Sequence, residues 1–133
     1  MNIYALSSGR GPSGIAIIRL SGKGVEKISK LITKEVSLSS REVNLCKFYN
    51  PENNSLIDEG LLLWFPGPNS FTGDDLAEFH IHGSNAVISC FLEVLSMQKN
   101  CRLAEPGEFT KIAFHNNKID LVRAESIGDL IHS

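Results

Sequence analysis

The sequence has no excess of basic residues and no long apolar run, and both absences narrow the classes of protein that it can represent. The sequence has 13 Lys and Arg residues and 15 Asp and Glu residues, so non-specific binding of nucleic acid by this chain is not expected. No run approaches the ~20 consecutive apolar residues that a membrane-spanning helix needs. The opening MNIYALSSGRG has neither the apolar core of a secretory signal nor an Arg-rich amphipathic presequence. We therefore expect a globular protein without a membrane partner.

Cysteine is scarce, and the sequence signatures of catalysis are missing. The three cysteines (Cys46, Cys90 and Cys101) form neither a CxxC motif nor a zinc-ligand spacing, which argues against a disulfide-stapled secreted domain. We interpret them as small apolar residues in a reducing compartment. The sequence contains no GxxxxGK(S/T) phosphate loop, no GxSxG nucleophile elbow and no Cys/His constellation. The chain is therefore expected neither to hold GTP in a phosphate loop nor to be catalytic alone.

Hydrophobic periodicity predicts one α+β domain built on a mixed β-sheet with flanking helices. The 133 residues, 42% of them hydrophobic, are enough for one compact domain. Strands are expected at 15–20, 43–49, 56–65, 76–82 and near 102–104, and helices over 23–33, after Ser84, through 114 and over 120–133. The turn-forming segment 50–55 predicts that its two flanking strands are antiparallel, and the Pro- and Gly-rich segment 66–75 predicts a loop.

The segment Gly9–Gly14 matches the pattern GxGxxG, but its context is wrong for a dinucleotide site. That fingerprint follows a strand and opens a helix, so that the pyrophosphate lies at the helix N-terminus. Here the glycines precede a strand, and Pro12 lies inside the loop. We interpret the segment as an entry loop that can approach a ligand or a partner backbone.

Polar residues alternate along the strand predicted at 76–82. Glu78, His80 and His82 share one face, because side chains on a strand alternate between its two sides. A face of this kind can recognise a ligand or can simply be solvated. Its residue types also suit zinc, with His115 or Asp75 completing the ligand set. Recognition of an organic ligand is the favoured interpretation, and no metal is assigned.

Two cations and one helix start also stand out. Arg19 interrupts an apolar strand, where an arginine pairs with a carboxylate for structure or serves a ligand. Lys118 follows the Asn116-Asn117 turn. Ser84 precedes a predicted helix, where the unpaired N–H groups are capped by the serine or bind an anion.

Three segments of the chain resemble the N-terminal segments of the MnmE/TrmE family of tRNA-modification GTPases. These are GIAIIRLSG (14–22), LWFPGPNSFTGDDLAEFHIHG (63–83) and PGEFTKIAFHNNKIDLVRAESIGDLI (106–131). The stretch between Lys23 and Leu56 carries no signature of the family. The opening ALSSG is similar to mitochondrial members, which implies a mitochondrion rather than the alternative, a bacterial cytoplasm.

The resemblance implies a fold similar to the tetrahydrofolate-binding domain of the glycine-cleavage T-protein. In this family the N-terminal domain forms a homodimer and binds a reduced folate, such as 5-formyl- or 5,10-methylene-tetrahydrofolate. The full-length proteins add GTP, Mg and K sites. With an MnmG-type FAD partner they modify C5 of the tRNA wobble uridine. The expected division is a folate-binding and dimerisation domain at 1–119, followed at 120–133 by the start of a helical domain.

The resemblance also assigns the folate contacts, residue by residue, to Arg19, Glu78 and Lys118. Phe71 is expected to be an aromatic wall beside the ring, and His80 is a further residue of the ligand face, where many bacterial relatives have another residue. No catalytic residue is implied within this chain. The residue types suit these roles, because a pterin presents adjacent N–H donors that one carboxylate can accept.

Overall fold

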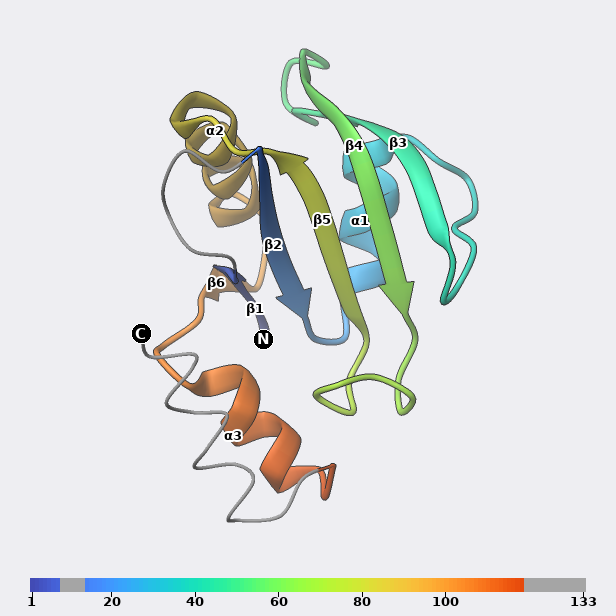
Figure 1. Cartoon of the computed structure of the whole chain (residues 1–133), viewed down its shortest axis with the longest axis vertical. Helices are drawn as coiled ribbons and strands as arrows, with labels where there is room; N and C mark the ends of the chain where they lie inside the picture. Colours follow the sequence, from blue (N-terminus) through green and yellow to red (C-terminus); the bar gives the residue numbers. More distant parts are fainter. Residues whose placement is uncertain (8–13, 119–133) are drawn as a thin grey trace.

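The computed structural model describes residues 1–7 and 14–118, which form one sheet with helices beside it (Figure 1). In chain order the elements are β1 (Asn2–Leu6), β2 (Ile15–Ser21), α1 (Val25–Thr33), β3 (Val43–Tyr49), β4 (Leu56–Phe65), β5 (Leu76–His82), α2 (Asn85–Ser96), β6 (Cys101–Leu103) and α3 (Glu108–His115). The six strands have the order β3-β4-β5-β2-β1-β6. β1 and β6 are parallel, and the other neighbours are antiparallel. The mixed sheet confirms the predicted α+β class.

Most predicted elements are confirmed close to their expected bounds. β3, β4 and β5 begin and end where the sequence places them, and β3 and β4 form the predicted antiparallel pair. The hydroxyl of Ser84 accepts a hydrogen bond from the Val87 N–H at 3.2 Å, so this serine caps α2 as expected. The helix predicted at 120–133 and the loop predicted at 9–14, except for Gly14 itself, lie outside the described residues.

Strand β1 was missed by the sequence reasoning. It pairs antiparallel with β2 and parallel with β6, so it lies inside the sheet rather than at an edge. Tyr4 is buried, and its neighbour Ile3 is only 2% exposed. Five residues at the start of the chain give too short an alternation to separate a strand from an extended leader, and the pairing with β6 is a tertiary contact that no local pattern reveals.

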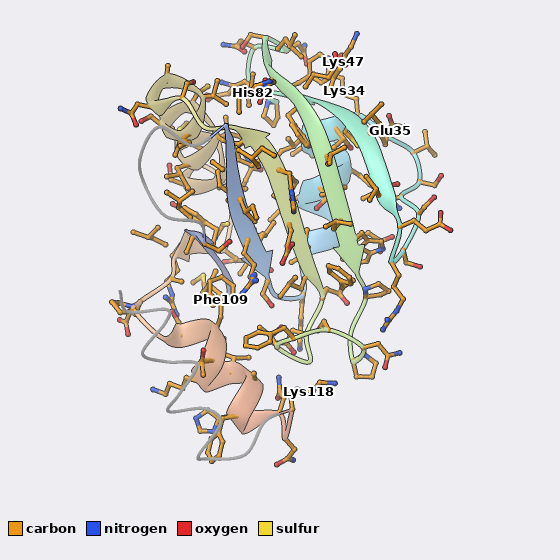
Figure 2. All side chains as sticks on the ribbon, viewed as in Figure 1. Lys34, Glu35, Lys47, His82, Phe109 and Lys118 are labelled. Atoms are coloured by element: carbon orange, nitrogen blue, oxygen red, sulfur yellow. The ribbon has the colours of Figure 1, made fainter. Side chains whose placement is uncertain are left out.

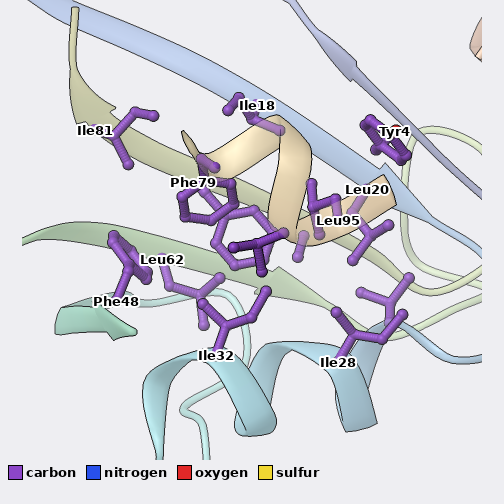
Figure 3. Packing of buried hydrophobic residues seen from close by; sticks show 14 of the residues in the cluster. Tyr4, Ile18, Leu20, Ile28, Ile32, Phe48, Leu62, Phe79, Ile81 and Leu95 are labelled. Carbon is purple, nitrogen blue, oxygen red and sulfur yellow. The ribbon is translucent and has the colours of Figure 1, made fainter. Parts of the chain in front are cut away.

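The core lies between one face of the sheet and helices α1 and α2. Phe48 of β3, Phe79 of β5 and Phe91 of α2 have their ring centroids 4.9–5.7 Å apart. Figure 3 shows Ile28 and Ile32 of α1 facing the buried side chains of the sheet. On β3 and β5, the strand period of two explains why the buried Phe48 and Phe79 alternate with half-buried or exposed neighbours. Among the described residues, no helix has the length and apolar character needed to cross a bilayer.

The opposite face of the sheet, here called the outer face, combines apolar and charged residues. At the β3 edge it carries Val43 and Leu45, which are 60% and 78% exposed. Toward the centre it carries Glu78 and His80 of β5 and Arg19 of β2, because these alternate with the buried positions of their strands. The predicted ligand residues therefore lie on the face that α1 and α2 do not cover.

A charged contact fixes the connection between β6 and α3. Arg102 Nη1 donates to Glu108 Oε1 at 2.8 Å, and the same oxygen accepts the Glu105 backbone N–H at 2.9 Å. The hydrogen bond from Arg102 is the main reason that the pKa of Glu108 lies below its usual range. This turn sets the direction in which α3 leaves the sheet.

Replacing Glu108 with glutamine is expected to remove part of the acid sensitivity of folding. Because folding lowers the pKa of this carboxyl, its contribution to stability is present above the usual carboxyl range and is lost as the pH falls through the folded-state pKa. The free energy of unfolding, measured by urea denaturation from about pH 7 to about pH 3, should therefore differ most between wild type and Glu108→Gln near neutrality. The two curves should converge in acid. A difference that stays constant with pH would contradict this assignment.

Candidate ligand-binding site

A pocket of about 460 Å³ opens on the outer face, at the end of the sheet where β4 and β5 enter the loop at 66–75. It is lined by Arg41, Phe65, Asn69, Ser70, Phe71, Leu76, Glu78 and Lys118. Two of the three predicted folate contacts, Glu78 and Lys118, border this cavity together with the predicted aromatic residue Phe71. The structure thus brings together residues that lie 40 positions apart in the sequence.

Glu78 presents a carboxylate whose two oxygens each have a partner. Arg19 lies opposite it in the β2–β5 register, and Arg19 Nη2 is 3.1 Å from Glu78 Oε2. The ring of His80 lies 3.3 Å from the other oxygen, Oε1. The Glu78 side chain is 20% exposed, so it is partly withdrawn from water and still reachable from the pocket.

Arg19 connects this carboxylate to two aromatic rings. Its guanidinium carbon is 5.6 Å from the ring centroid of Phe71 and 5.9 Å from that of Phe109, which is within the range of a cation–π contact. Arg19 therefore makes the structural ion pair that its place inside an apolar strand suggested, and its partner is Glu78, which is itself a predicted ligand residue. The Arg19 Nε atom is buried and has no hydrogen-bond partner within the described part of the chain. Phe109 is a neighbour of the site that the sequence reasoning did not identify.

The loop at 66–75 is held by its own short polar side chains. The Gly67 N–H donates to Asp75 Oδ1 at 2.8 Å, and the Gly73 N–H donates to Ser70 Oγ at 3.0 Å. The Thr72 side chain is fully buried and lies 2.8 Å from the hydroxyl of Ser21 at the end of β2. These contacts tie the loop to the sheet and fix the backbone that carries Phe71.

Lys118 follows the end of α3 and lies beside the loop at 66–75 (Figure 2). Its ammonium group donates to the Pro68 carbonyl oxygen at 2.9 Å. Two positions earlier, Asn116 Nδ2 donates to the Thr72 carbonyl at 2.7 Å. The sequence marked the two asparagines only as a turn, yet Asn116 fastens the lysine's segment to the loop.

The charges around the pocket favour a ligand with both donor and acceptor groups. Arg41 and Lys118 supply cations to the lining, and Glu78 supplies a carboxylate. Arg41 Nη2 also donates to the Asn69 carbonyl at 2.8 Å, so it is held against the loop. Arg41 was not predicted, because it lies in the stretch without family signatures.

His82, the third residue of the alternating polar set, does not join the other two. Its Nδ1 is 2.8 Å from Asp58 Oδ1, and its backbone N–H donates to Asp58 Oδ2 at 2.8 Å. Burial alone would raise the pKa of Asp58, but these hydrogen bonds outweigh it and lower that pKa. Within residues 1–7 and 14–118, no three His, Cys, Asp or Glu side chains are grouped as metal ligands. The geometry therefore gives the zinc interpretation of this face no support.

A second hollow, of about 430 Å³, lies between α1, the β3–β4 turn and α2. Leu31 and Met97 contribute apolar surface to it, and Glu52 and Glu93 contribute its charges. Its described lining contains none of the predicted ligand residues and no ion pair comparable to that of Arg19 with Glu78. The pocket on the outer face is therefore the candidate site.

Comparison with known proteins settles the family. Residues 2–118 match the family described as "GTP-binding protein TrmE N-terminus". The chain belongs to this family. Its match begins in β1 and ends at the pocket lysine, Lys118, so the TrmE N-terminal family includes every element of the fold and the whole candidate site.

Relatives of the TrmE family come from bacteria and from mitochondria. The chain is 58% identical over 131 residues to the tRNA modification GTPase MnmE of Pelagibacter ubique, covering 98% of this chain and 30% of that protein. It is 50% identical to the mitochondrial tRNA modification GTPase gtpbp3 of Dictyostelium discoideum, covering 97% of this chain and 26% of that protein. It is 47% identical to the mitochondrial 5-taurinomethyluridine-[tRNA] synthase subunit GTPB3 of Danio rerio, covering 98% and 26%. The chain thus spans less than a third of each of these relatives.

Proposed function

We propose that this chain is the reduced-folate-binding and homodimer-forming domain of a tRNA-modification GTPase. The observation that carries the proposal is the pocket in which Glu78, Phe71 and Lys118 meet, within a chain of the TrmE family. The ligand would be a tetrahydrofolate derivative such as 5-formyl- or 5,10-methylene-tetrahydrofolate. The similarity to the folate-binding domain of the glycine-cleavage T-protein, expected from the sequence, is part of this proposal.

The pterin ring is the part of a folate that Glu78 would recognise. A pterin presents neighbouring N–H donors along one edge, and a carboxylate can accept two such bonds side by side. The Glu78 carboxylate lies on a strand rather than on a flexible loop, and Arg19 balances its charge at 3.1 Å. Phe71 lines the same cavity and offers a flat apolar surface for the ring.

The cations of the pocket suit the rest of the molecule. A folate carries carbonyl groups and a glutamate tail with carboxylates, all of which accept hydrogen bonds. Lys118 and Arg41 lie in the same lining, and both are exposed, as expected for groups that meet a tail extending into solvent. An arrangement with one carboxylate and two cations around one cavity is therefore complementary to a reduced folate.

Calorimetric titration with 5-formyl-tetrahydrofolate tests the proposal directly. We expect saturable binding at one ligand per chain. Two fragments serve as controls: p-aminobenzoylglutamate, which lacks the pterin, and a pterin, which lacks the tail. Both are expected to bind more weakly than the whole ligand. Absence of binding by the intact ligand would leave a domain with a purely structural, dimer-forming role.

The names of the relatives support a proposal for the whole protein. Their names describe tRNA modification and GTPase activity. We propose that the full protein, with GTP, Mg and K bound in another domain and with an MnmG-type FAD partner, modifies C5 of the tRNA wobble uridine. We place it in the mitochondrion, with the bacterial cytoplasm as the alternative. The division at residue 119 between the folate domain and a helical domain belongs to the same proposal.

The outer face offers the surface for homodimerisation. Val43 and Leu45 are strongly exposed at its β3 edge, and Leu61 and Leu63 of β4 lie beside them in register. An interface that uses the same surface on both copies closes into a symmetric dimer. Burial of these aliphatic side chains would supply the main free energy of association.

Replacing Leu45 with aspartate is expected to convert the dimer into a monomer. A carboxylate on each copy would lose water in the interface without gaining a partner, which is costly. Light scattering coupled to size-exclusion chromatography should show the change of mass. Leu31→Asp is the matched control, because Leu31 is 48% exposed on α1, on the other side of the sheet. A Leu45→Asp protein that stays dimeric would place the interface elsewhere.

A further inference from the structure

We infer that His80 is a positioning residue of the pocket, which holds the Glu78 carboxylate together with Arg19 in one orientation. This inference rests on the proposed folate site, because it concerns the group that would accept the ligand's N–H donors. It assigns His80 an action through Glu78 and requires no contact between the imidazole and the ligand.

The two oxygens of Glu78 are held from two strands. Arg19 on β2 occupies Oε2 at 3.1 Å, and His80, two residues along β5, occupies Oε1 at 3.3 Å. The last torsion of a glutamate side chain is broad, so a single contact leaves the carboxylate plane free to turn. A carboxylate has about four lone-pair sites, so two donors fix the plane and still leave about two sites for a ligand.

The surroundings of His80 make its polar contact specific. Its cross-strand neighbours are Ile17 of β2 and Leu61 of β4, which are apolar. The His80 side chain is 20% exposed, so water competes only weakly for the ring. The bond to Glu78 therefore forms in a partly desolvated setting, where a hydrogen bond orients its partners more firmly than at an open surface.

His82 provides an internal comparison on the same strand and the same face. Its ring bonds Asp58 through Nδ1 at 2.8 Å, and its side chain is 72% exposed. His80 contacts Glu78 through Nε2 instead. For each ring to donate to its carboxylate in the neutral state, the proton must be on Nε2 in His80 and on Nδ1 in His82.

Imidazole ¹⁵N NMR of the ligand-free protein, recorded at a pH where the ring signals are those of neutral imidazole, reads out these tautomers directly. We expect opposite tautomers: Nε2–H for His80 and Nδ1–H for His82. An Nδ1–H tautomer at His80 would overturn the inference, because its Nε2 would then present a lone pair to the carboxylate. This result does not depend on any ligand.

Titration of three variants with 5-formyl-tetrahydrofolate measures the consequence for binding. His80→Leu removes the donor and is expected to weaken binding roughly two- to tenfold. His80→Gln keeps an N–H donor and should restore most of the affinity. His82→Gln should leave the affinity unchanged. Thermal melts of all three variants control for loss of folding.

The outcomes separate the inference from the proposed function. If wild type binds and His80→Leu binds equally well, the positioning role is wrong and the folate site stands. If the wild-type protein does not bind 5-formyl-tetrahydrofolate although His80 has the Nε2–H tautomer, the folate assignment is wrong. The role of His80 in orienting the Glu78 carboxylate is then still supported. A weakened His82→Gln variant would also contradict the role given specifically to His80.

Discussion

Replacing Glu78 with alanine is expected to weaken the binding of 5-formyl-tetrahydrofolate by roughly 10- to 150-fold, as the loss of a charge-assisted hydrogen bond predicts. The change removes the one carboxylate that the described residues contribute to the lining of the pocket. Pterin N–H donors that lose this acceptor would be left in a site where the Glu78 side chain is only 20% exposed. Unpaired donors in such a setting cost more than the same loss at an open surface.

Calorimetry on matched variants makes this expectation specific to Glu78. Glu59→Ala is the control, because Glu59 is an exposed carboxylate on the neighbouring strand β4. Lys118→Ala should cost less than Glu78→Ala, because the exposed ammonium is screened by water and salt. Glu78→Gln keeps the shape of the side chain and reports on its charge. Unchanged affinity in Glu78→Ala would refute the site assignment.

Replacing Phe79 with alanine is expected to lower the free energy of unfolding by about 3–5 kcal/mol. Phe79 is fully buried and is 4.9 Å from Phe91 and 5.7 Å from Phe48, measured between ring centroids. Its removal leaves a cavity between the sheet and α2 as well as losing the transfer free energy of the ring. A domain of this size has ~5–15 kcal/mol of stability in total, so the variant would be close to unfolding.

Urea denaturation followed by tryptophan fluorescence measures this loss, because Trp64 is buried in the same core cluster. Phe114→Ala is the matched control, since this phenylalanine on α3 is 37% exposed. The control should change the free energy of unfolding by less than about 1 kcal/mol. Equal effects of the two substitutions would contradict the central place given to the three-ring cluster.

Local patterns were sufficient to predict the middle of the fold. The alternation of β5 identified this strand, because a side chain's face is fixed by a period of two. β3 and β4 were identified as the strands that flank a turn-forming segment. The turn residues at 50–55 identified the pairing of β3 with β4. β1 was missed because its five residues are too short for a clear alternation, and its pairing with β6, almost a hundred residues away, arises only in the folded sheet.

Some residues of the candidate site were also visible in the sequence, and others appeared only in the structure. Glu78 and Arg19 are conspicuous in sequence because each places a charge inside a strand. Their direct pairing at 3.1 Å depends on the β2–β5 register, which no local signal specifies. Phe109, Arg41 and Asn116 join the site only through tertiary contacts. The folate roles of Arg19, Glu78 and Lys118 stay predictions until a ligand is titrated.

The place of β1 between β2 and β6 determines the order in which the domain can be completed during synthesis. The Asn2 N–H donates to the Asn100 carbonyl at 2.7 Å, and the Ala104 N–H donates to the Tyr4 carbonyl at 2.8 Å. The first strand to leave the ribosome can pair with β2 early, but it meets its other neighbour only after β6, the last of the six described strands, has been made, and forming so non-local a pair is slow. α3 and Lys118 follow β6, so the pocket is assembled last. A ligand bound at this pocket would then need the finished domain, because a nascent chain that stops before β6 lacks the sixth strand and the lining residue Lys118.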